Sequence, residues 1–206
     1  YNLNSNNNTA EVVASQGTKY TGDISIPYYV YYGNTSYTVT SIGLSAFEKC
    51  TDLNSVTIPS TIKTLEQGAF YKCSNLICVK IPEGVTKIGL GAFSKCSKLT
   101  SVIIPSTVTQ IDEYAFDYCT SLSHIVSVIQ QPNVFEDNVF DTHSSSYSVY
   151  SQATLVVPDG AKATYNSKSG WIKFTNIKEA SEQKTRSIHV AKAGTLPDLI
   201  SDLEKY

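Results

Sequence analysis

The stretch LNSVTIPSTIKTLEQGAFYKC, residues 53–73, decides the fold of this chain. In its first part Val56 and Ile58 alternate with Ser and Thr, and this two-residue period is typical of a β-strand. Pro59 ends the strand, because proline has no N–H to donate to a neighbouring strand. We therefore expect a short strand that stops at its proline.

The second part of this stretch predicts another short extended piece and then a tight turn. Ile62 and Leu65 are the apolar residues of the extended piece, and Ala69-Phe70 follows on a turn or short 3₁₀ segment. The side chains that we expect to point inward are Leu53, Val56, Ile58, Ile62, Leu65, Ala69, Phe70 and Cys73. Phe70 is expected in the middle of the unit.

The same pattern returns every 23 residues. The recurring residues are Ala46, Ala69, Ala92 and Ala115; Phe47, Phe70, Phe93 and Phe116; Cys50, Cys73, Cys96 and Cys119; Leu53, Leu76, Leu99 and Leu122; and Pro59, Pro82 and Pro105. One unit alone buries too little apolar surface to offset the conformational entropy that it loses, so the units must stack. The expected fold is mainly β with short helical turns, a right-handed solenoid whose strands lie about 4.8 Å apart.

Both ends of such a stack need caps, because they would otherwise expose strand edges and core. At the first end, Ile26-Pro27 matches Ile58-Pro59 but is followed by nine inserted residues. The insertion predicts a β-hairpin with its turn at Gly33-Asn34. Its tyrosines are Tyr28, Tyr29, Tyr31, Tyr32 and Tyr37.

At the other end the period is lost after Leu122. Phe135 and Phe140 are interpreted as remnants of the Ala-Phe turn, and Trp171 and Phe174 are expected to cover the open end of the core. A last strand is expected at 153–158, a helical turn at 161–165, a strand at 188–190 and a helix from 195. The predicted organisation is an N-terminal cap at 1–41, repeats at 42–129, a C-terminal cap at 130–178, and a linker with the start of a following module at 179–206.

The 23-residue step, the Ile-Pro motif and the Ala-Phe-x-x-Cys motif resemble the BspA-like leucine-rich repeats, also called the Treponema-type class. The resemblance covers about residues 24–127 directly, and residues 153–174 resemble the C-terminal cap of such proteins from Bacteroides-type bacteria. This chain departs from the commoner leucine-rich pattern, since Cys stands near the usual Asn and no long helix is predicted. The resemblance implies an exported or surface-anchored bacterial module that binds host proteins, other bacteria or matrix.

Composition narrows the function further. Hydrophobic residues make up 41% of the 206 residues and charged residues 17%, which is typical of a folded chain, and the net charge of −2 supplies no overall field for nucleic acid. No run of about 18 apolar residues could span a membrane. The chain begins at Tyr1 and has no Met, so we expect it to be a processed or trimmed fragment, with any export signal or anchor upstream.

No motif for catalysis, metal or cofactor binding is present. The four periodic cysteines are expected to form a buried, reduced column, because stacked units do not converge them as a zinc site requires. Cys78 occupies an outward strand position and is expected to be partly exposed. His124, His143 and His189 have no triad partners in a known pattern. We therefore expect no enzyme and no cofactor.

Two surfaces are candidate binding sites. The first is the outward strand face, formed by Ser55, Thr57, Cys78, Lys80, Ser101, Ile103, His124 and Val126. The second is the tyrosine hairpin, since tyrosine suits both protein interfaces and sugar stacking. The simpler alternatives are a solvated face, tyrosines packed on the first repeat, and a solvated row of Lys49, Lys72 and Lys95.

The leading functional hypothesis is protein binding and adhesion at the cell surface, to host or bacterial proteins. The alternatives are a carbohydrate-binding accessory module, motivated by the tyrosines, and a structural spacer within a larger surface protein. The capped ends favour a monomer.

Overall fold

The computed structural model describes residues 1–141 and 147–183, and strands dominate this part of the chain. Its helices are α1 (Val149–Gln152), α2 (Lys162–Tyr165) and α3 (Ala180–Gln183). In the described residues no helix is long enough to cross a lipid bilayer. The predicted mainly β character is confirmed, whereas the strand at 188–190, the helix from 195, His143 and His189 lie outside the described residues.

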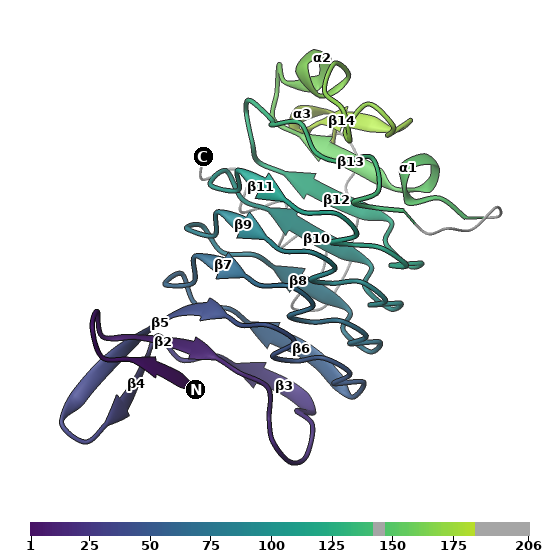
Figure 1. Cartoon of the computed structure of the whole chain (residues 1–206). Coiled ribbons are helices and arrows are strands. Elements are labelled where there is room, and N and C mark those ends of the chain that lie inside the picture. Colours follow the sequence, from purple (N-terminus) through teal and green to yellow (C-terminus); the bar gives the residue numbers. More distant parts are fainter. Residues whose placement is uncertain (142–146, 184–206) are drawn as a thin grey trace.

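Successive repeats add strands to a parallel sheet. Its strands in spatial order are β8 (Cys78–Lys80), β10 (Ser101–Ile104), β12 (His124–Ser127), β13 (Thr154–Val157) and β14 (Ile177–Glu179). The register follows the 23-residue period, because Ser101 pairs with Cys78 on one side and with His124 on the other. The strand β6 (Leu53–Thr57) pairs instead with β3 (Gly22–Ser25) in a separate two-stranded sheet. Figure 1 shows the strands lying side by side along the molecule.

A second sheet runs along the other side of the repeats. It contains β1 (Asn2–Asn4), β2 (Thr9–Val12), β5 (Thr35–Ile42), β7 (Thr64–Leu65), β9 (Lys87–Ile88) and β11 (Gln110–Ile111), with β4 (Tyr29–Tyr32) paired to β5. The predicted second extended piece around Leu65 is therefore confirmed as the two-residue strand β7. β1 pairs antiparallel with β2 and covers the first edge of this sheet.

A column of phenylalanine rings forms the middle of the core. Phe47, Phe70, Phe93 and Phe116 are buried, and Phe140 extends the column, which confirms its interpretation as an Ala-Phe remnant. Neighbouring rings lie 5.0 to 5.2 Å apart and within 7° of parallel. This interval matches the strand spacing of a sheet, so each repeat places its ring directly on the ring before.

The buried cysteines connect one repeat to the one before. The Cys73 thiol donates to the Phe47 carbonyl oxygen at 3.1 Å, and Cys96 donates to the Phe70 carbonyl oxygen at 3.2 Å. Burial raises the pKa of the Cys73 thiol to about 12, which keeps it protonated as the donor. None of the five cysteines, all of which lie in the described residues, forms a disulfide.

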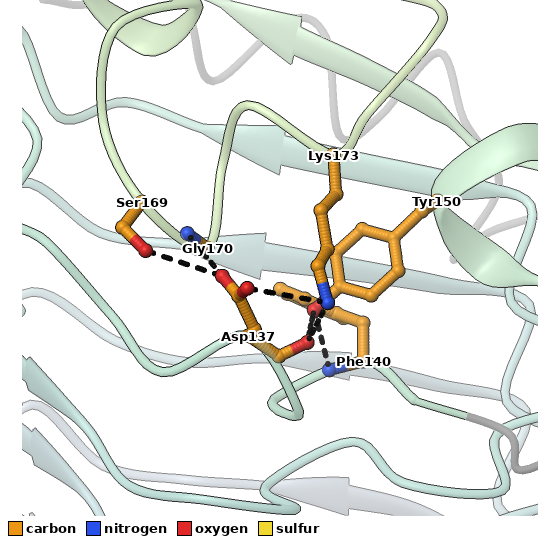
Figure 2. Close-up of polar contacts among 6 residues, drawn as sticks. All are labelled: Asp137, Phe140, Tyr150, Ser169, Gly170 and Lys173. Carbon is orange, nitrogen blue, oxygen red and sulfur yellow. Dashed lines mark hydrogen bonds and ion pairs between the residues drawn. The ribbon is translucent and has the colours of Figure 1, made fainter.

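The C-terminal cap is held by Asp137, as Figure 2 shows. Its carboxylate accepts hydrogen bonds from the Ser169 hydroxyl at 3.1 Å and the Gly170 N–H at 3.2 Å, and lies 3.5 Å from the Lys173 ammonium. Its carbonyl oxygen accepts bonds from Lys173 at 3.0 Å and from the Tyr150 hydroxyl at 2.8 Å. One residue therefore joins the end of the repeats to the segment that covers the core.

The stability of the cap is expected to depend on pH through Asp137. The hydrogen bond from Ser169, with smaller contributions from Lys173 and Gly170, lowers the pKa of this carboxyl. A carboxyl with a lowered folded-state pKa stabilises the fold above its unfolded pKa of about 3.9, and this contribution is lost as the pH falls through the folded-state value. The melting temperature should therefore fall less steeply in acid for Asp137→Asn than for the wild type. Parallel curves would contradict this role of Asp137.

Candidate binding surfaces

The tyrosine hairpin is present as predicted. β4 pairs antiparallel with β5, with Tyr29 opposite Thr38 and Tyr32 opposite Thr35. Gly33 adopts φ 58°, the left-handed conformation that glycine allows in a tight two-residue turn. Figure 1 shows the hairpin projecting away from the stacked strands at the first end of the molecule.

Four of the five hairpin tyrosines lie on the surface. Tyr28, Tyr29, Tyr31 and Tyr32 expose 53%, 52%, 76% and 73% of their surface. Tyr29 and Tyr31 share one face of the ribbon, because side chains two residues apart in a strand point the same way. The fifth, Tyr37, is buried in the core beside Val39, so its assignment to the binding surface is corrected.

The outward strand face has the predicted register but is not continuously open. Ile103 and Val126 point away from the main core and are nevertheless buried, in a separate apolar cluster with Val156. Val128 and Ala180, the first residue of α3, pack against this cluster. A linker is predicted from residue 179, but here the structure has the end of β14 and α3. These two candidate binding residues are therefore corrected to packing residues.

The other predicted positions of this face differ in how exposed they are. Thr57 and Lys80 are exposed, whereas Ser55 is half-buried and donates a hydrogen bond to the Asp23 carboxylate at 2.6 Å. His124 is half-buried with its Nδ1 3.0 Å from the Ser123 hydroxyl, and burial lowers its pKa. In residues 1–141 and 147–183 no cluster of three His, Cys, Asp or Glu side chains could hold a metal ion.

A third surface, which the sequence did not identify as a site, runs along the turns that follow the Ala-Phe pairs. We call it the turn-edge groove; it has a volume of about 390 Å³ and is lined by Thr51, Lys72, Ser74, Lys95, Ser97, Tyr118 and Thr120. A neighbouring groove of about 560 Å³ shares Lys95 and Tyr118 and contains Tyr71, Glu48 and Glu113. The available signal was the row of hydroxyl residues directly after the periodic cysteines, at 51, 74, 97 and 120.

A short strand, a bend at proline and an apolar turn, repeated in stacked units, define a leucine-rich-repeat protein. The model of the BspA-type leucine-rich repeat region matches six copies over residues 26–147, and the chain therefore belongs to this family. The family resemblance predicted from the sequence is confirmed. None of the curated protein sequences matches this chain.

Solved structures of low sequence identity share the fold. A leucine-rich repeat protein from Bacteroides ovatus is 24% identical over 86% of this chain and 51% of its own, with a TM-score of 0.54. The leucine-rich repeat protein of T. pallidum is 20% identical over 61% of this chain and 67% of its own, with a TM-score of 0.50. The pneumococcal vaccine antigen PcpA is 16% identical over 85% of this chain and 45% of its own, with a TM-score of 0.54. This chain thus spans about half the length of the B. ovatus protein.

Proposed function

We propose that this chain is a non-enzymatic module of a bacterial cell-surface protein, and that its β4–β5 hairpin binds a protein partner in adhesion. The observation that carries the proposal is the group of four tyrosines that are each more than half exposed on one projecting hairpin. Exposed apolar groups of this kind are typical of interaction sites. Tyrosine is also enriched among the residues that dominate binding energy.

The hairpin is better suited to this role than the outward strand face. The apolar residues of that face are covered by Val128 and α3, whereas Tyr31 and Tyr32 stand at the tip of the hairpin. Tyr37 anchors this two-stranded ribbon in the core, and an anchored backbone loses less entropy on binding.

The rest of the chain serves, in this proposal, as a scaffold that holds the hairpin away from the cell. The whole chain is then a right-handed solenoid in an extracellular protein, with a cap at 1–41 that includes the hairpin, repeats at 42–129 and a second cap at 130–178. Coverage of the repeats by β1 at one end and by the buried Trp171 at the other supports a monomer.

The proposal is tested with the purified chain on an array of extracellular-matrix proteins, mucins, bacterial surface proteins and glycans. The double variant Tyr29→Ser/Tyr31→Ser should lose at least about tenfold in affinity for a bound protein. Ile172→Ser removes an equally exposed apolar side chain from the C-terminal cap and should bind normally. Both variants should melt near the wild-type temperature. Binding only to glycans would favour the carbohydrate-binding alternative. Binding to nothing on the array would favour the structural spacer.

A further inference from the structure

We propose that the turn-edge groove is a separate binding site, for the anionic groups of a linear acidic polysaccharide. The site is independent of the hairpin, because it is formed by the turns of the central repeats. The acidic groups would contact Lys72 and Lys95, and the sugar hydroxyls would bond to the serine and threonine side chains beside them.

Two lysines in the groove have no acidic partner within the described part of the chain. The Lys72 ammonium lies 5.2 Å from the centre of the Tyr71 ring. The Lys95 ammonium lies between two rings, 5.8 Å from that of Tyr71 and 5.3 Å from that of Tyr118. Aromatic rings position an ammonium group without cancelling its charge. Lys49, in contrast, pairs with Glu48 at 3.1 Å.

The backbone at these lysines has the same conformation in successive repeats. Lys72 and Lys95 adopt φ 60° and 63°, a left-handed conformation that is uncommon for residues with a side chain. Glycine would adopt it with less strain. The equivalent Lys49 and Tyr118 have φ 58° and 53°, so this conformation belongs to the turn of each repeat and fixes the direction in which the side chain at this position leaves the turn.

Residues with hydroxyl groups line the groove together with the two lysines. Ser74, Ser97 and Thr120 follow the cysteines of successive repeats and line the groove with the lysines. Equivalent positions recur at the interval of the ring column, 5.0 to 5.2 Å. Glu48 and Glu113 line the neighbouring groove on the other side of Lys95, so an anion should approach from the hydroxyl side.

This arrangement fits an acidic polysaccharide better than other anions. The hydroxyl row extends over several repeats, so it matches a polymer that carries hydroxyl groups between its charges. Tyr118 lies at the end of this row and offers an aromatic surface to a sugar ring. A nucleic acid would require a broad positive field, which a net charge of −2 does not supply.

The test is the affinity of the whole chain for heparin, polygalacturonate, dextran and polyphosphate. Heparin carries sulfate groups, polygalacturonate carries carboxylates, and dextran is neutral. We expect at least one acidic polysaccharide to bind and dextran not to bind, with an affinity that falls as salt screens the charges. A preference for heparin or for polygalacturonate identifies the anionic group.

The matched variants remove two charges each. Lys72→Gln/Lys95→Gln should weaken binding by about tenfold or more. Lys63→Gln/Lys168→Gln, whose lysines do not line the groove, should bind like the wild type. Tyr29→Ser/Tyr31→Ser should also bind normally, which separates this site from the hairpin. The inference is overturned if dextran binds equally well, if only polyphosphate binds, or if both lysine variants weaken binding equally.

Discussion

Replacing Phe93 with alanine is expected to lower the free energy of unfolding by about 3–5 kcal/mol, the usual cost of emptying a buried phenylalanine site. Phe93 is fully buried and stacks on Phe70 at 5.1 Å and on Phe116 at 5.2 Å. The change removes both ring contacts and leaves a cavity that the sheets on either side hold open. Chemical denaturation followed by far-ultraviolet circular dichroism, which reports on all the strands, measures the effect.

Two control variants show whether the cavity is the cause. Phe93→Leu keeps most of the volume and should cost clearly less than the alanine variant. Ile77→Ala removes an apolar side chain that is 53% exposed, next to β8, and should change stability by no more than about 0.5 kcal/mol. An unchanged melting temperature for Phe93→Ala would show that the inward assignment of the repeat is wrong.

The repeat itself could be predicted from the sequence because each inward position is sampled several times. A single Phe in a single turn is weak evidence, but Phe at the same place in four units fixes both the period and the inward face. The two short strands of each unit, at Val56 and at Leu65, were predicted for the same reason. A periodic chain also makes most contacts between neighbouring repeats, so local pattern and global packing agree.

Coverage by a distant segment could not be predicted in this way. Alternation places Ile103 and Val126 on the outward face correctly, but whether water reaches them depends on Ala180, far along the chain. The misassignment of Tyr37 has another cause. It was grouped with the hairpin tyrosines by residue type, although Tyr37 and Val39 are two residues apart and are both buried on the same side of β5.

The turn-edge groove required the structure because it arises between repeats. The sequence shows the lysine row and the hydroxyl row, and a solvated stripe explained the lysines adequately. The left-handed backbone at Lys72 and Lys95 and the rings on either side of Lys95 became visible only after the turns were stacked.

The second large effect is expected at the C-terminal cap, where Phe174→Ala should cost about 3–5 kcal/mol but act locally. Phe174 is buried, with ring centres 5.3 Å from Phe140 and 5.0 Å from Tyr150. Its loss leaves the last ring of the phenylalanine column and Trp171 incompletely covered. Because repeats are stabilised mainly by their neighbours, the cap should then unfold while the central repeats stay folded.

Two probes separate local from global unfolding. Trp171 fluorescence reports on the cap, and far-ultraviolet circular dichroism reports on all the strands. In Phe174→Ala the fluorescence transition should occur at a lower denaturant concentration than the dichroism transition. In Phe93→Ala the midpoints of the two transitions should lie closer together, because the cavity lies in the central repeats. Ile172→Ala, at a cap position that is 57% exposed, should leave both transitions unchanged. Coincident transitions in Phe174→Ala would mean that cap and repeats form one cooperative unit.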